Sequence, residues 1–292
     1  MLLNQTGREK ITSNATRTIH DLIHVRRLEE HWTKRGRLPT GALTDIEQTG
    51  LARAMKESTL SRRRFVSKYA GRWLGTRSNL SRWGYRISAV CQLCKQFDER
   101  VEHILVCKNP KANIKWFQAM TGLHKWFLEQ NTDPGAAAFI IRLLHTWRNG
   151  QPPPSTEALG NWNTAFLHQA ELGWQGFFDG FISPHWAVLQ HQYFRDNNQR
   201  KTGKRWATKV IKKMWSLAWD FWELRNELVL EETVRNEAPE NEAINLQIDQ
   251  EYAKGLDRIP ARWSGLFQEH AERLKSKSIL HRKEWVATVD KL

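Results

Sequence analysis

The stretch CQLCKQFDERVEHILVC, residues 91–107, contains all three cysteines of the chain and a single histidine. Cys91 and Cys94 are separated by two residues, a spacing at which a tight turn brings two thiolates to one metal ion. His103 and Cys107 are four residues apart in a run of helix-forming residues, so we expect both on one face of a helix. The pattern therefore predicts a Cys3His metal site.

Four protein ligands fill the coordination sphere of a tetrahedral zinc ion, which leaves no position for an activated water molecule. The sequence thus predicts a structural Zn2+ and not a catalytic one. The alternative is a set of small buried thiols beside a surface histidine. The clustering of every cysteine around a histidine at helical spacing favours the metal site.

The composition is that of a basic globular protein. The 292 residues include 45 Lys+Arg and 31 Asp+Glu, a formal net charge of +14, and the mean hydropathy is −0.64. Residues 1–110 alone carry a net charge of +11, whereas 12 of the 15 Trp lie in residues 111–292. A chain with this balance is neither a disordered tail nor a membrane-spanning protein, and its expected large partner is a polyanion.

The positive charge is concentrated just before the cysteines. Between Arg53 and Arg86 there are ten Lys or Arg and one acidic residue. In a helix expected over 59–74, Phe65, Tyr69 and Trp73 form an aromatic stripe beside a cationic one. We interpret the stretch as a phosphate-binding surface, against the alternative of a solvated basic face around a core stripe. The residues predicted to bind nucleic acid are Arg62, Arg63, Arg64, Lys68, Arg72, Arg77, Arg82 and Arg86.

The segment from Arg62 to Cys107 resembles the zinc-binding region downstream of the polymerase in reverse transcriptases of non-LTR retrotransposons. The resemblance covers roughly residues 60–110. It places Cys91, Cys94, His103 and Cys107 at the four ligand positions and Glu99 at an acidic position before the histidine. Gln92 stands where proline is commoner in that family. The resemblance implies a transposon-derived accessory segment that binds RNA or DNA.

A second resemblance lies in the Trp-rich half. AELGWQGFFDGFISPHWAVLQHQYF, residues 170–194, and the helix ending in WELRNEL, residues 222–228, are similar to the segment after the zinc motif in other transposon-derived proteins. The matching residues are Gln169, Gly173, Trp174, Trp222, Arg225 and Asn226. No biochemical role comes with this resemblance.

The sequence contains no recognisable catalytic constellation. No Asp-Asp dipeptide is present, so the two-metal site of a polymerase cannot be assigned. No Pro-Asp dipeptide begins a restriction-like nuclease motif either. A metal-dependent nuclease remains an alternative only if isolated carboxylates such as Asp179, Asp220 and Glu223 converge in space.

The expected fold is mainly α, a helical bundle with a small Cys3His zinc-binding module. We expect a basic helical module over 1–110, connecting helices over 111–150 and a Trp-rich bundle over 151–292, with a linker at the prolines of 151–156. Helices are expected over 14–36, 44–57, 59–74, 111–129, 136–147, 162–172, 184–198, 203–232 and 257–275. The helix over 203–232 is apolar on two faces and should be central. The acidic stretch 231–242 is expected to be a solvated loop.

These observations predict a zinc-stabilised, nucleic-acid-binding accessory segment without polymerase catalytic residues. The alternative is a zinc-stabilised scaffold in which the Trp-rich half binds a protein partner and nucleic acid has no role. The opening residues lack the apolar region of a secretory signal, and no apolar run reaches the about 18 residues of a membrane helix. We therefore expect an intracellular location, with the nucleus as one option, and no membrane partner.

Overall fold

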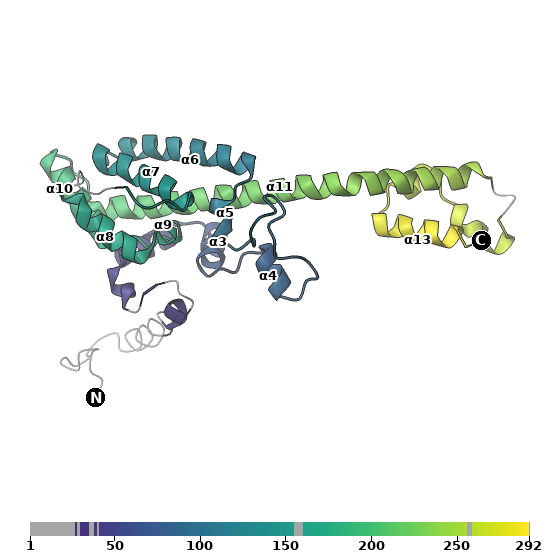
Figure 1. The fold of residues 1–292 in the computed structure, drawn as a ribbon, viewed down its shortest axis with the longest axis horizontal. Helices are drawn as coiled ribbons and strands as arrows, with labels where there is room; N and C mark the ends of the chain where they lie inside the picture. Colours follow the sequence, from purple (N-terminus) through teal and green to yellow (C-terminus); the bar gives the residue numbers. More distant parts are fainter. Residues whose placement is uncertain are drawn as a thin grey trace, which may run out of the picture. The chain divides into compact units, whose positions relative to one another are not determined.

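The computed structural model describes residues 27, 30–34, 38, 39, 41–154, 160–255 and 259–291. Within these residues the secondary structure is helical and no strand is present, apart from one isolated antiparallel bridge between Val90 and Asp98. The mainly α fold predicted from the sequence is confirmed (Figure 1). The helix expected over 14–36 lies largely outside the described residues.

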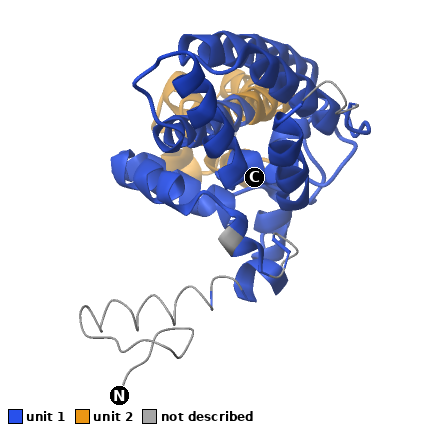
Figure 2. Ribbon diagram, turned by 90° about the vertical axis from the view of Figure 1, so that its left-hand side faces the viewer, with its two compact units in different colours: residues 1–225 blue, residues 226–292 orange. Residues whose placement is uncertain are grey.

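The chain divides into two compact units, Met1–Arg225 and Asn226–Leu292 (Figure 2). Buried side chains as far apart in sequence as Tyr69, Phe127 and Trp215 share the main core of the first unit. The three-part division at residues 110 and 150 was drawn from composition and charge, and it stays a prediction.

In its described residues, the first unit is built from five short elements, followed by five further helices and the first part of a long one. The short elements are η1 (Ala42–Asp45), α2 (Gln48–Glu57), α3 (Leu60–Ala70), α4 (Arg77–Arg82) and the single-turn helix α5 (His103–Val106). They are followed by α6 (Pro110–Glu129), α7 (Pro134–Arg148), α8 (Trp162–Leu172), α9 (Trp174–Asp179), α10 (Pro184–Asp196) and α11 (Gly203–Ala253). Helices α6 and α7 pack side by side as a helical hairpin (Figure 1).

Three of these helices begin with the same local signal. The side chains of Asn109, Asp133 and Ser183 each accept a hydrogen bond from a backbone N–H of the following turn. Each of these cap residues is followed by a proline, whose missing N–H costs nothing in the first turn of a helix. The starts of α6, α7 and α10 are therefore encoded locally.

The first part of α11 lies at the centre of the unit 1 core. Its predicted burial on two faces is confirmed, because Trp206, Met214 and Trp215 are each at most 3% exposed. The Trp206 indole N–H donates to Thr132 Oγ1 at 2.8 Å, and that of Trp215 donates to the carbonyl of Asp179 at 3.1 Å. These indoles are core residues with satisfied polar atoms, as expected for buried Trp.

Two predicted helix boundaries are wrong. Helix α3 ends at Ala70 and not at residue 74, because Gly71 closes the helix and Arg72 adopts a left-handed φ of 63°. Trp73 therefore leaves the aromatic stripe and is 47% exposed. The acidic stretch 231–242 is helical and belongs to α11, which continues through Pro239 to Ala253. Its five Glu residues are good helix formers, and together with the helix already formed before them they outweigh the single proline.

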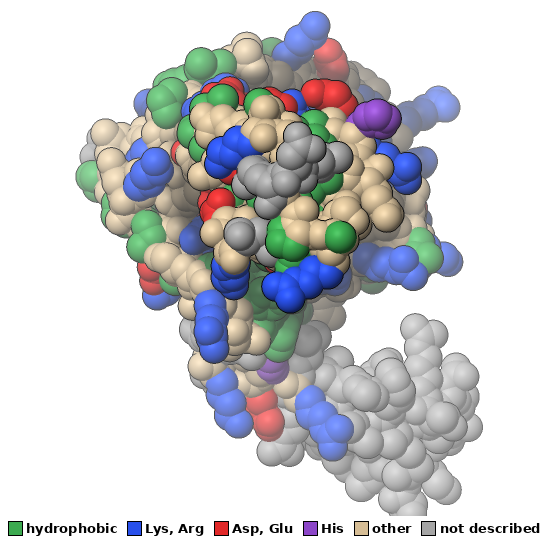
Figure 3. Space-filling view, turned by 90° about the vertical axis from the view of Figure 1, so that its right-hand side faces the viewer, with side chains coloured by type: hydrophobic (Ala, Val, Ile, Leu, Met, Phe, Trp, Pro, Cys, Tyr) green, Lys and Arg blue, Asp and Glu red, His purple; other side chains and the backbone are tan. Residues whose placement is uncertain are grey.

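The second unit has a small core of its own. The end of α11, η3 (Ala261–Phe267), α12 (Ala271–Lys275) and α13 (Ile279–Val289) contribute buried Ile248, Phe267, Leu274 and Trp285. The helix expected over 257–275 is thus two short elements, and they share a core with the end of α11 and not with its Trp-rich part. No helix of the described residues has the length and apolar character needed to cross a membrane. On the face drawn in Figure 3, Lys and Arg side chains are spread over the surface with Asp and Glu side chains among them.

Candidate metal centre and basic surface

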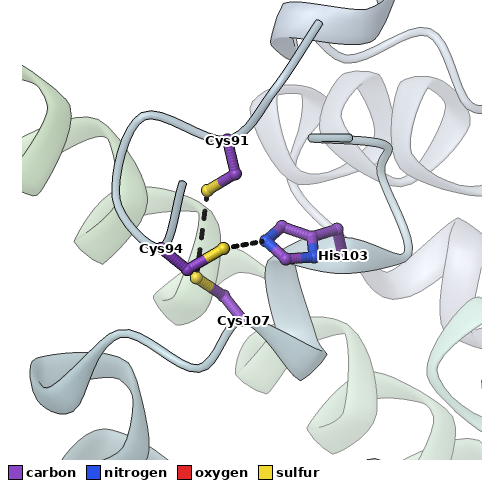
Figure 4. Close-up of side chains that lie close together, drawn as sticks. All are labelled: Cys91, Cys94, His103 and Cys107. Carbon is purple, nitrogen blue, oxygen red and sulfur yellow. Dashed lines mark hydrogen bonds between the residues drawn. The ribbon is translucent and has the colours of Figure 1, made fainter. Parts of the chain in front are cut away.

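The loop that carries Cys91 and Cys94 folds back on itself. The Cys91 N–H donates to the carbonyl of Phe97 at 2.8 Å, and the Lys95 N–H donates to the carbonyl of Cys91 at 2.9 Å. Lys95 adopts a left-handed φ of 56°, which turns the chain directly after Cys94. Both thiols consequently face α5, which carries His103 at its start (Figure 4).

The four predicted ligands come together in the structure. The three Sγ atoms and one imidazole nitrogen all lie within 4.8 Å of one another, so they could hold a metal ion. The Sγ atoms of Cys91 and Cys107 are 4.0 Å apart, and Cys94 Sγ lies 3.4 Å from His103 Nε2. Cys107 is the residue after α5, so its thiol and the His103 ring are one helical turn apart as the spacing predicts.

The centre is enclosed and its thiols interact. Cys91 is 1% exposed and Cys107 is 4% exposed. The hydrogen bond with Cys107 lowers the pKa of Cys91, and the same contact raises the pKa of Cys107. A metal ion at this centre would bind both cysteines as thiolates.

Arg148, at the end of α7, holds the backbone of residues 91–107, the segment with the four predicted ligands, which we call the metal loop. Its Nε donates to the carbonyl of Leu105 at 2.8 Å, and its Nη2 donates to the carbonyl of Cys107 at 2.9 Å. The guanidinium also lies over the Trp116 ring, 5.0 Å from its centroid. The sequence analysis missed this residue, since nothing local to Arg148 indicates a partner about forty residues away.

Glu99 joins the metal loop to α11. It is 1% exposed, and its carboxylate accepts two hydrogen bonds from Arg225, at 2.9 and 2.5 Å. The Arg77 N–H donates to the same carboxylate at 2.8 Å. Glu99 and Arg225 were both singled out by the resemblances, which gave no reason to pair them.

No family model, curated protein or solved structure matches this chain. The resemblance to the region downstream of retrotransposon polymerases therefore stays a prediction from residues and motifs. The chemistry open to the site follows from its geometry.

Three of the eight cations predicted to bind nucleic acid are partly buried and contact other residues of the protein. Arg62 lies over the Trp219 ring, 4.6 Å from its centroid. Arg72 forms two hydrogen bonds with Asp179, at 2.8 and 3.0 Å, and an ion pair with Glu102. Arg77 donates to the carbonyl of Ser88 at 2.9 Å and to Gln92 at 3.2 Å, which positions the chain before and within the metal loop.

The other five cations, Arg63, Arg64, Lys68, Arg82 and Arg86, are exposed. Within the described part of the chain, no carboxylate forms an ion pair with Arg64, Lys68 or Arg86. Arg63 donates to the carbonyl of Ser58 at 2.9 Å, and this contact with a neutral group leaves its charge uncompensated. The basic surface therefore consists of these five exposed cations and not of the eight predicted from the sequence, and it retains its positive charge.

A pair of tryptophans lies on this surface. The rings of Trp73 and Trp83 are stacked, with centroids 6.0 Å apart and an interplanar angle of 15°. Trp83 is 41% exposed, and the neighbouring Tyr85 is 61% exposed. Arg82 lies over the Trp73 ring at 5.7 Å. Trp73 was predicted to lie in an aromatic stripe with Phe65 and Tyr69, because the helix was expected to continue to residue 74, and no contact was predicted for Trp83.

The three carboxylates named for a nuclease do not form one metal-binding group in the described part of the chain. Asp179 is bound by Arg72, whereas Asp220 and Glu223 lie on α11. Among the residues that the structure describes, the Cys3His group is the one set of three or more His, Cys, Asp or Glu side chains close enough to hold a metal ion.

Proposed function

We propose that this chain is a zinc-stabilised, nucleic-acid-binding accessory segment, related to the region downstream of the polymerase in non-LTR retrotransposon reverse transcriptases. The observation that carries the proposal is the exposed Trp73–Trp83 stack, with Arg82 over it and other uncompensated cations in the same segment. Arg77, in the helix between the two tryptophans, connects this surface to the metal loop. An intracellular location, the nucleus included, is part of the proposal.

Zinc is the metal that suits the donor set. Three thiolates and one imidazole are typical ligands of a structural zinc ion. With Zn–S bonds of about 2.3 Å, two thiolates on a tetrahedral ion lie about 3.8 Å apart, and the Sγ atoms of Cys91 and Cys107 are separated by 4.0 Å. The ion would fix the loop after α4, because Cys91 and Cys94 belong to that loop and His103 and Cys107 flank α5.

Metal content tests this part directly. We expect one zinc ion per purified chain by elemental analysis, and its loss in Cys91→Ser or Cys107→Ser variants. Because ligand binding and folding are coupled in small metal modules, a chelator should lower the melting temperature of the first unit. Excess zinc should restore it. A chain without bound metal whose melting curve is unchanged by the chelator would refute the zinc assignment.

Stacking on the tryptophans indicates a single-stranded partner. Nucleotide bases in a single strand are accessible to aromatic side chains, and each base stacked on one contributes about 1–3 kcal/mol. Duplex DNA or RNA offers its bases less readily, because they are stacked on one another. Exposed arginines beside the rings can bind phosphate oxygens of the same strand.

The test is a double variant, Trp73→Ala with Trp83→Ala, in the full chain. Binding of a fluorescent oligouridine of about 16 nucleotides is measured by anisotropy at low salt. Loss of one stacked base should weaken binding about tenfold to about 100-fold. Trp263→Ala is the matched control, because Trp263 is also exposed but lies in the second unit. Equal affinity of the double variant and the wild type would contradict the proposal.

A protein-interaction scaffold is the second candidate. The same exposed Trp pair favours it, because exposed aromatic rings are enriched where proteins bind one another. The two candidates differ in salt dependence: binding of a nucleic acid weakens steeply with salt, and burial of apolar rings by a protein does not. Absence of RNA and DNA binding at low salt would favour the scaffold.

A further inference from the structure

The Trp-rich half contains a second concentration of positive charge. RKTGKRWATKVIKK, residues 200–213, has seven cations and no acidic residue. It spans the end of the connection before α11 and the first turns of that helix. The nearly balanced charge of residues 111–292 concealed this stretch in the sequence analysis.

Six of the seven cations of this stretch line two adjoining hollows in the first unit. The first hollow, of about 390 Å³, has five cationic lining residues: Arg53 of α2 together with Arg200, Lys201, Arg205 and Lys209. The second, of about 480 Å³, adds Lys212 and Lys213. Both hollows are lined by Gln130, Arg205 and Lys209, so they form one continuous groove, called the basic groove below.

The basic groove retains most of its charge. Of the described residues that line it, Glu57 is the one carboxylate, and it pairs with Lys212 at 3.2 Å and with Arg53 at 3.8 Å. Lys209 donates to Gln130 Oε1 at 2.8 Å, and Lys201 donates to Asn131 Oδ1 at 3.0 Å. These amide partners position the ammonium groups without neutralising them.

The cations also repeat along the groove. Arg205, Lys209 and Lys213 are four residues apart in α11, so they lie on one face with an axial rise of about 6 Å between neighbours. Such a row is longer than a single phosphate group. It suits a ligand that carries many negative charges in sequence.

We propose that the basic groove binds the sugar-phosphate backbone of a nucleic acid strand, as a second contact region besides the Trp73–Trp83 stack. Its arginines supply forked donors for phosphate oxygens, and its lysines supply point charges. The proposal assumes the nucleic-acid partner proposed above, and it does not depend on the tryptophans.

The test uses two triple variants of the full chain. The groove variant is Arg205→Gln, Lys209→Gln and Lys213→Gln. The control variant is Lys125→Gln, Arg195→Gln and Lys204→Gln, which removes three exposed cations that do not line the groove. Affinity for a fluorescent oligouridine is measured between about 50 and about 200 mM salt.

The expected result follows from counterion release. Each phosphate contact to a single strand contributes about −0.7 to the slope of log K against log salt. Loss of three contacts should make the slope about 2 units shallower and weaken binding at low salt, and the control variant should keep the wild-type slope. Equal slopes for the groove variant and the wild type would overturn the proposal.

Competition with a small anion and a combined variant complete the test. Inorganic tripolyphosphate and a longer oligouridine are compared as competitors that displace the fluorescent oligouridine. If tripolyphosphate is as effective per mole as the longer oligouridine, the groove is a site for a small anion and the proposal is overturned. The groove triple variant is also combined with Trp73→Ala and Trp83→Ala. If only the groove substitutions weaken binding, the proposal for the Trp stack is refuted and that for the basic groove is supported. If only the Trp substitutions weaken binding, the proposal for the basic groove is refuted and that for the Trp stack is supported. A wild-type chain that binds no nucleic acid would overturn both.

Discussion

Replacement of Glu99 by glutamine should destabilise the first unit more than replacement of any exposed carboxylate. Glu99 is 1% exposed and its carboxylate is bound by Arg225, whose side chain is 13% exposed. Glutamine fills the same volume and can still accept from the Arg77 N–H. The substitution therefore removes the negative charge and leaves the Arg225 guanidinium buried without it.

The magnitude follows from the burial of both partners. Removal of one partner from a buried ion pair costs about 3–5 kcal/mol, because the remaining charge is desolvated and uncompensated. The slight exposure of Arg225 lets water reach part of its charge, so we expect about 3 kcal/mol. For a unit of this size, 1 kcal/mol corresponds to a shift in Tm of about 2–4 °C, so Tm should fall by about 6–12 °C.

The assay is urea unfolding of zinc-saturated protein, followed by far-UV circular dichroism. Glu99→Gln, Arg225→Met and the double variant form a cycle that isolates the interaction. The double variant should be more stable than Glu99→Gln alone, because it contains no buried guanidinium that has lost its carboxylate. The control is Arg53→Gln, which removes an exposed pair with an N···O distance of 3.8 Å and should cost less than about 0.5 kcal/mol.

Two results would refute this reasoning. A Glu99→Gln variant within about 1 kcal/mol of the wild type would show that water solvates Arg225 in the folded protein. Additive effects of the two single substitutions would show that the carboxylate and the guanidinium act independently.

Four other substitutions have distinct expected outcomes. Arg148→Lys should weaken zinc affinity about 10-fold to 100-fold in a competition titration, because the single nitrogen of a lysine head group cannot reproduce the geometry of the Nε and Nη2 bonds to the carbonyls of Leu105 and Cys107. Burial lowers the pKa of His145 in the folded protein, and the charge of Arg148 contributes less to the same shift. The neutral form of His145 therefore stabilises the fold above about pH 6.5, the ordinary pKa of histidine. This stability is lost as pH falls through the lower pKa of the folded state. His145→Gln should therefore lose less stability than the wild type in urea melts between about pH 7.5 and about pH 5.5; an equal loss would contradict the assignment. Gly203→Ala should destabilise the protein by more than about 2 kcal/mol, because a Cβ there would meet a backbone carbonyl of α10 at 1.6 Å. Gly122→Ala, which meets nothing within 4 Å on the surface of α6, should stabilise it by up to about 1 kcal/mol, and a loss of stability there would contradict the helix assignment.

The ligand set could be predicted because its information is local. All four ligands lie within the 17 residues 91–107. The spacing of Cys91 and Cys94 predicts a tight turn, and that of His103 and Cys107 predicts one turn of helix. The supports of the site could not be predicted in the same way. Glu99 meets Arg225 across 126 residues, and a pairing over such a separation depends on how the helices pack.

The helices were predicted best where caps or apolar periodicity were strong. Helix α8 was predicted with the observed bounds, whereas α3 was extended past Gly71 because the aromatic spacing continued. That extension had a functional consequence, since it aligned the exposed Trp73 with Phe65 and Tyr69, which are buried. The stretch 231–242 was assigned to a loop from its charge and Pro239, although a long helix tolerates both when it is already nucleated.

Helix α11 contributes to the cores of both units, and the stretch between those contributions has almost no buried side chains. From Leu230 to Ala243 every residue is exposed or only partly buried, and Pro239 removes one backbone hydrogen bond there. A break in this stretch would expose neither core. The two units should therefore unfold as separate cooperative transitions, and a protease that cleaves near Pro239 should release two fragments that each remain folded.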